Sequence, residues 1–220
     1  MHWIRPHLAL APLPGRFARV ALFGPDALGR PEVEGLISAV YLARYGARLR
    51  SFMPQLLAFY DDQHQLLAAV GLRSADEGQL FSEQYLTSPV EAVMANRGIA
   101  WVTRAEIVEV GNFAAVTPGI ARELILQVTC MLAAARRPWV LFVATQQLRN
   151  AFRRLHLSPI ELAEASAERL NDKGSDWGDY YASHPKLMCG NVAQGKAYLP
   201  SAGTSDEPDA WLSPCMAVMS

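Results

Sequence analysis

The stretch TRAEIVEVGNFAAVTPGIARELILQVTCMLAAARRPWVLFVATQQLRNAFRRL, residues 103–155, decides the fold of this chain. Residues 103–110 at its start alternate well enough to predict a strand. After a turn, apolar side chains recur at helical spacing over residues 120–136 and predict a long helix. Residues 139–144 are a continuous apolar run typical of a buried strand, and residues 148–155 predict a basic amphipathic helix. This order of strand, helix, strand and helix predicts an α/β protein.

The residues before this stretch predict a helix and an antiparallel pair of strands. Residues 31–48 carry apolar side chains at helical spacing, with acidic residues at the start and basic residues at the end, as the helix dipole favours. Residues 55–60 and 66–72 are apolar runs joined by a polar connector of hairpin length. Residues 89–95 predict a short helix, and the segment 81–86 before it is a candidate for part of an active site.

The composition is that of a globular protein. The 220 residues are 51% hydrophobic and 19% charged, which is enough to bury a full core. We expect a single domain over residues 1–199 and a mobile tail over residues 200–220, where small and polar residues gather. Twenty basic residues nearly balance 21 acidic ones, so the net charge favours neither nucleic acid nor an anionic membrane as a partner.

The cysteines and the apolar segments indicate in which cellular compartment the protein is expected. Cys130, Cys189 and Cys215 are far apart and odd in number, which argues against a disulfide framework or a zinc site, so we expect no metal. Residues 1–13 lack the apolar core and cleavage site of an export signal. No apolar run reaches the roughly 20 residues that span a bilayer. We therefore expect a cytoplasmic protein without a transmembrane segment.

Four ordered segments resemble the thermostable hemolysin family. They are residues 80–91, 104–114 and 145–155, together with the aromatic motif at residues 177–181. That family is similar in layout to the GNAT acyltransferase superfold and to acyl-homoserine-lactone synthases. The resemblance implies a mixed, mostly antiparallel central sheet flanked by helices. It also implies acyl transfer from a thioester, with a small-molecule amine as the acceptor.

The resemblance also implies a place for the thioester donor. In GNAT folds a loop of pattern Gln/Arg-x-x-Gly-x-Gly/Ala holds a pyrophosphate at a helix N-terminus. The matching residues here are Val116, Gly119, Ile120 and Ala121, joined by Asn150 and Arg153 on a later helix. Val116 stands where the pattern has Gln or Arg, and Pro118 removes one N–H, which argues against ordinary acetyl-CoA and leaves room for a carrier protein or a differently held thioester. The expected donor is acyl-CoA or an acyl carrier protein thioester.

Acyl transfer to an amine needs a base to take the proton and a donor to polarise the carbonyl. The candidates are Glu83, Arg104, Glu109 and Asn112. Glu109 lies near the end of an apolar strand, where burial would raise its pKa. Lactone synthases carry Glu and Arg three residues apart on a comparable strand, whereas Asn112 occupies the second position here, which argues against lactone synthesis.

Each candidate also has a structural interpretation. Glu109 could form an ion pair with Arg104 or Arg122, and Glu83 could be a polar residue among aromatic neighbours. The motif aromatics, Trp177, Tyr180 and Tyr181, could line an acyl or acceptor pocket or simply pack in the core. The arginines of residues 148–155 could contact phosphates or an acidic carrier protein, or lie in solvent.

The function that the sequence favours is acyl transfer from a thioester to the amine of an amino acid or small metabolite. Two alternatives stay open. One is a membrane-active hemolysin, which would need an exposed amphipathic or spanning segment. The other is an acyl-group binding protein without catalysis. Nucleotide hydrolysis is excluded because residues 190–196 match most of a P-loop but Ala197 replaces the Ser or Thr that would bind magnesium.

Overall fold

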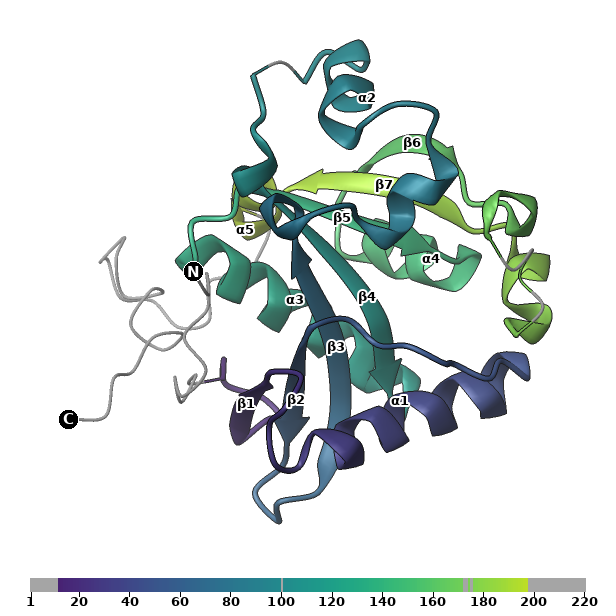
Figure 1. The fold of residues 1–220 in the computed structure, drawn as a ribbon. Helices are drawn as coiled ribbons and strands as arrows, with labels where there is room; N and C mark the ends of the chain where they lie inside the picture. Colours follow the sequence, from purple (N-terminus) through teal and green to yellow (C-terminus); the bar gives the residue numbers. More distant parts are fainter. Residues whose placement is uncertain (1–11, 100, 172–173, 175, 198–220) are drawn as a thin grey trace, which may run out of the picture.

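The computed structural model describes residues 12–99, 101–171, 174 and 176–197 (Figure 1). One seven-stranded sheet runs through it in the order β1-β2-β3-β4-β5-β7-β6. Only β4 and β5 pair in parallel, and all other neighbours are antiparallel, which confirms the predicted mixed, mostly antiparallel fold. The strands are β1 (Arg19–Phe23), β2 (Gln55–Tyr60), β3 (Leu66–Ser74), β4 (Ile107–Ala115), β5 (Trp139–Ala144), β6 (Ile160–Glu164) and β7 (Lys186–Asn191).

Helices cover both faces of the sheet. They are α1 (Arg30–Tyr45), α2 (Val90–Asn96), α3 (Pro118–Ala134), α4 (Gln146–Arg154) and α5 (Val192–Ala197), with 3-10 turns η1 (Ala75–Glu77), η2 (Phe81–Tyr85), η3 (Arg104–Glu106), η4 (Ala167–Arg169) and η5 (Gly178–Ser183). The apolar side of α1, with Val33 and Ile37, packs on one face, and that of α3, with Leu124 and Val128, packs on the other (Figure 1). The sheet is therefore the middle layer of three.

The largest differences from the predicted boundaries are in β4 and α1, and those at the start of β4 and the end of α1 have local reasons. The strand expected over residues 103–110 begins only at Ile107, because the Glu106 carboxylate accepts hydrogen bonds from the N–H and hydroxyl of Thr103 and closes the turn η3. It then continues to Ala115. The helix expected to reach residue 48 ends at Tyr45, because Gly46 adopts a left-handed conformation with φ 65°.

Three strands were missing from the prediction. β1 and β6 are short edge strands, and charged residues interrupt the apolar pattern of β6 (Ile160–Glu164). β7 lies between β5 and β6, and it pairs with β5 over its whole length. Short strands of this kind lack the sustained alternation by which a strand is detected.

The sheet opens between β4 and β5. The two strands pair over residues 107–110 and 139–142 and then fan apart (Figure 1). In the same region β4 carries a bulge: Gly111 pairs with Gly71, but Ala114 pairs with Ala69, so β4 has one residue more than β3. Asn112 within the bulge has a positive φ of 48°. The bulge and the divergence leave room inside the fold.

The predicted C-terminal tail and the apolar segments lie outside the question of sheet topology. The predicted tail over residues 200–220 lies outside the described residues. Within the described ranges, every helix is too short or too polar to cross a bilayer.

Candidate active site

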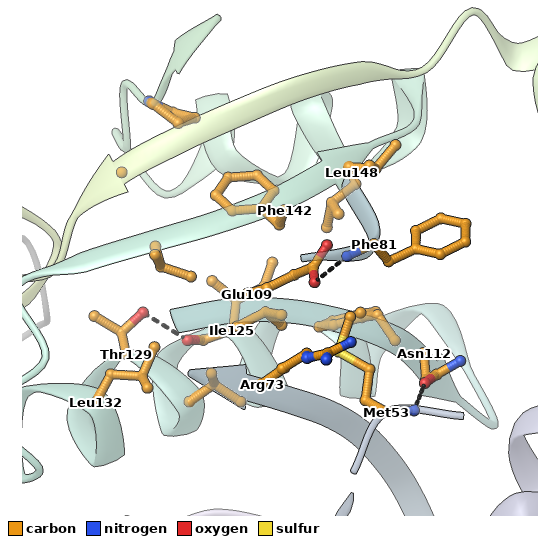
Figure 2. A pocket seen from close by; sticks show the side chains of 18 of the residues that line it. Met53, Arg73, Phe81, Glu109, Asn112, Ile125, Thr129, Leu132, Phe142 and Leu148 are labelled. Carbon is orange, nitrogen blue, oxygen red and sulfur yellow. Dashed lines mark hydrogen bonds between the residues drawn. The ribbon is translucent and has the colours of Figure 1, made fainter. Parts of the chain in front are cut away.

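A cavity of about 730 Å³ lies where β4 and β5 separate. Both faces of the sheet contribute to its walls, because the gap between the strands joins the two sides. Val110, Val140 and Phe142 of the two strands line this gap. Figure 2 shows the cavity with β4 and β5 spreading apart around it.

The two sides of the cavity differ in chemistry. On the α3 and α4 side its walls are mainly aliphatic, with an aromatic ring from α4: Ile125, Val128, Leu132, Leu148 and Phe152. On the side facing α1 and η2 the walls are mainly aromatic: Tyr41, Phe81, Tyr85, Trp177 and Tyr180. Trp177 and Tyr180 of the sequence motif therefore line the pocket, while also packing against each other at 5.2 Å between ring centroids. The aliphatic side suits a hydrocarbon chain, and the aromatic side suits a flatter or cationic group.

Glu109 supplies a carboxylate to the cavity, and only 2% of the residue is exposed to solvent. Its two oxygens accept hydrogen bonds from the backbone N–H groups of Phe81 at 3.0 Å and Ser82 at 2.7 Å (Figure 2). The structure gives it neither of the arginine partners considered from the sequence, since Arg104 pairs elsewhere and no ion pair joins Glu109 to Arg122. The carboxylate is thus held by backbone donors.

The environment of Glu109 makes its charged form less favourable than that of a carboxyl group in water. Burial raises the pKa of the Glu109 carboxyl above its ordinary value of 4.5, and this effect outweighs the backbone donors and the positive charge of Arg73. A carboxylate that is costly to keep ionised is a stronger proton acceptor than one in water. A general base needs a proton acceptor of this kind, and the Glu109 carboxylate lies at the junction of the two sides.

Asn112 positions a loop over the cavity. Its side-chain oxygen accepts a hydrogen bond from the N–H of Met53 at 2.8 Å (Figure 2). The Met53 side chain lies against the paired glycines of β3 and β4: a Cβ on Gly111 would fall 2.5 Å from its Cε, and one on Gly71 would fall 2.8 Å from its Cβ. Two facing glycines thus make the space that Met53 fills. Asn112 lines the cavity beside them.

Arg73 is a cavity residue that the sequence prediction missed. It stands directly opposite Glu109 in the β3–β4 register and lines the same space. Its Nε is buried and has no hydrogen-bond partner among the described residues. A single charged residue beyond an apolar run looks like a strand end, and the predicted strand stopped one residue before it. If the register of the antiparallel strands β3 and β4 had been known, it would have identified Arg73.

Glu83 and Arg104 form a separate cluster outside this cavity. The guanidinium of Arg104 donates to Glu83 at 2.8 Å and Glu91 at 2.9 Å, and to the backbone oxygens of Ala75 and Gly78, both at 2.8 Å. Arg104 thus joins η1, η2 and α2. Of the four catalytic candidates, the structure brings Glu109 and Asn112 into the cavity and places Glu83 and Arg104 beside it.

Glu83 itself is fully engaged. Besides Arg104, its oxygens accept the backbone N–H groups of Leu80 at 2.8 Å and Val90 at 3.1 Å. Burial alone would raise the pKa of the Glu83 carboxyl, but Arg104 and the backbone donors outweigh burial and lower it. This carboxylate is stabilised as an anion, unlike that of Glu109.

The residues expected to hold the donor lie away from the described cavity. Val116 follows the end of β4, and Gly119, Ile120 and Ala121 lie in the first turn of α3, where the Arg16 side chain approaches Gly119. Ile120 is buried in the core beneath α3. On α4, the Asn150 side chain accepts a hydrogen bond from Gln146 at 3.1 Å, and Arg153 is exposed. Their role in binding a donor stays a prediction.

The described ranges contain no cluster of three or more His, Cys, Asp or Glu side chains that could hold a metal ion.

The sequence profile of the thermostable hemolysin family matches residues 24–196, most of the chain. This chain belongs to the thermostable hemolysin family. A search of curated proteins gives no match.

Several solved structures share the fold of this thermostable hemolysin family member at low sequence identity. The AHL synthase LasI is 11% identical, with a TM-score of 0.55 over 86% of this chain and 97% of its own. FeeM, an N-acyl amino acid synthase from uncultured soil microbes, is 13% identical, with a TM-score of 0.53 over 84% of this chain and 97% of its own. TofI in an apo form is 15% identical, with a TM-score of 0.53 over 81% and 94%.

Proposed function

We propose that this protein is an acyltransferase that moves an acyl group from a thioester to the amine of an amino acid or small metabolite. The observation that carries the proposal is the buried Glu109 carboxylate at the junction of an aliphatic and an aromatic side of one cavity. The shared fold with a synthase named for N-acyl amino acids and one named for AHL supports the same class of reaction.

The two sides of the cavity suggest how the reactants lie. The acyl chain would occupy the aliphatic side between α3, β5 and α4, where it removes apolar surface from water. The acceptor would occupy the aromatic side, with its nitrogen at Glu109. The thioester carbonyl would then lie in the gap between β4 and β5, where the pairing ends after Val110 and Phe142 and an extended donor would lie between the strands.

The chemistry follows from this placement. The amine nitrogen attacks the thioester carbonyl carbon, and the Glu109 carboxylate accepts the proton that the nitrogen loses. The carbon–sulfur bond then breaks, and the proton passes to the leaving sulfur, so the products are an amide and a free thiol. Because the Phe81 and Ser82 N–H groups hold both carboxylate oxygens, the base is already oriented before the substrate binds.

The proposed donor is acyl-CoA or an acyl carrier protein thioester, and a protein that uses either is expected in the cytoplasm, where such thioesters are made. The exposed Arg153 and Arg154 at the end of α4 are available to phosphates or to an acidic carrier protein. The two donors differ in size rather than in the reacting group. The rates of thiol release with acyl-CoA and with the acyl carrier protein thioester show which of the two is the donor.

The test is release of free thiol from a panel of acyl-CoA and acyl carrier protein thioesters, with and without mixed amino acids and amines. We expect release that depends on the acceptor, an amide product of matching mass, and loss of both in Glu109→Gln. If thioesters bind but no thiol is released with any acceptor, the protein is an acyl-group binding protein. Lysis of cells by the purified protein without an acyl donor would support the membrane-active alternative.

A further inference from the structure

The structure assigns to Arg73 the recognition of a carboxylate on the acceptor, which makes the acceptor an α-amino acid rather than a simple amine. This inference rests on the proposed function, because it names the substrate class for the same site. It concerns a residue on β3 that contributes to the cavity beside Glu109.

Arg73 has bonding capacity that the protein itself does not use. Its Nε is buried and has no hydrogen-bond partner in the described part of the chain, and Arg73 forms no ion pair with a described residue. A buried donor without a partner costs free energy, and in a cavity such a group is available to a ligand. The guanidinium offers donors in a planar fork, a geometry that matches the two oxygens of a carboxylate.

The strand register places the two charged side chains next to each other. Arg73 and Glu109 are directly opposite each other on neighbouring antiparallel strands, so their side chains leave the sheet on the same face about 5 Å apart at Cβ. Glu109 and Arg73 therefore lie close enough together to contact two groups of one small acceptor. In an α-amino acid the amine and the carboxylate are joined through a single carbon, so one such molecule presents both groups to this pair of side chains.

The donor does not supply an anion at this position. The phosphates of coenzyme A or of a carrier protein lie at the far end of pantetheine from the sulfur, whereas Arg73 stands next to the proposed base. Glu109 and Arg73 are also the only described acidic and basic side chains that line the cavity. A zwitterionic α-amino acid complements this pair of charges, and the aromatic walls formed by Phe81, Tyr85 and Trp177 remain for its side chain.

The test compares matched acceptors that differ only in the carboxylate. Tyrosine is compared with tyramine and tyrosinamide, and leucine with 3-methylbutylamine, using the acyl thioester that the wild type accepts best. We expect the wild type to prefer each amino acid over its amine in kcat/KM. In Arg73→Gln this preference should fall about 10- to 100-fold, the loss expected for one hydrogen-bonded ionic contact. Arg73→Lys, which keeps the charge but not the fork, should retain part of it.

The control variant is Arg169→Gln, which removes an exposed arginine outside the cavity and should leave the preference unchanged. Circular dichroism shows whether each variant is folded. Equal use of amino acids and amines by the wild type, or an unchanged preference in folded Arg73→Gln, would overturn the carboxylate assignment while leaving acyl transfer in place. No transfer to any acceptor by the wild type would overturn the proposed function as well.

Discussion

Two charged clusters contact the same turn, η2, and they are built in different ways. Arg104 and Glu83 use their hydrogen-bond capacity within the protein, on each other and on backbone groups. Glu109 and Arg73 face a cavity, and Arg73 keeps a buried donor without a partner among the described residues. Two clusters of the same residue types therefore differ in whether they have hydrogen-bond capacity left for a ligand, so charge and burial alone do not identify a catalytic residue. The unused bonding capacity of the group is the more informative property.

The two clusters are nevertheless connected through η2. Arg104 holds Glu83, and the neighbouring Phe81 and Ser82 donate to Glu109. We infer that Arg104 is a positioning residue, since it fixes the turn whose backbone orients the proposed base. Substitutions in the two clusters should therefore affect different properties: turnover for Glu109, and stability for Arg104.

The largest expected effect is on turnover. Glu109→Gln should lower kcat by about 10²- to 10⁴-fold, because general-base catalysis contributes about that much and the amide cannot accept the proton. Glu83→Gln is the matched control, a change of the same size on η2, and should lower kcat by less than about tenfold. Steady-state rates with a saturating thioester measure both. Comparable losses in the two variants would remove the distinction between the clusters.

The next effect is on stability. Arg104→Gln should lower the free energy of unfolding by about 2 kcal/mol, because it leaves the buried Glu83 carboxylate without its cation and two backbone oxygens without their donor. Chemical denaturation at pH 7 measures this loss. A variant as stable as the wild type would show that the cluster does not hold η1, η2 and α2 together.

The pH dependence of stability should have opposite signs for the two carboxylates. The pKa of Glu109 is raised in the folded protein, so its contribution to stability is present below 4.5 and is lost as the pH rises through the folded-state pKa. The pKa of Glu83 is lowered, so its contribution is present above 4.5 and is lost as the pH falls through the folded-state pKa. Melting temperatures of wild type, Glu109→Gln and Glu83→Gln between pH 3 and 8 test this, and parallel curves would contradict it.

The smallest expected effect is that of Arg73 on stability. Arg73→Gln should change the free energy of unfolding by less than about 1 kcal/mol, because removal of a buried donor without a partner offsets the lost attraction between Arg73 and Glu109. The same denaturation experiment as for Arg104→Gln gives the comparison. A loss as large as that of Arg104→Gln would mean that Arg73 is a structural residue.

The sequence predicted the central elements because their patterns are sustained. The long helix α3 and the apolar run of β5 were located within two residues, and Glu109 was recognised as a polar residue in an apolar strand. The edge strands β1 and β6 were missed because they are short and partly exposed.

The site was predicted only in part, because its geometry depends on strand register and on long-range contacts. Nothing local in the sequence shows that Arg73 faces Glu109, that Gly71 faces Gly111, or that Met53 fills the space between those glycines. The ion pair of Glu83 and Arg104 joins residues 21 positions apart, and the same residue types would suit a catalytic pair. The residue types predicted which chemistry is possible. The hydrogen-bond and ion-pair partners of each side chain could be known only from the fold.

The most direct test of the central claim, that Glu109 is the proton acceptor, is the pH profile of kcat/KM at a fixed concentration of unprotonated acceptor. For the wild type we predict a rate that falls at acidic pH with a midpoint above 4.5, reflecting the raised pKa of Glu109. The residual rate of Glu109→Gln should show no such fall. An acidic limb of the same midpoint in both proteins would contradict the assignment, because another group would then be taking the proton.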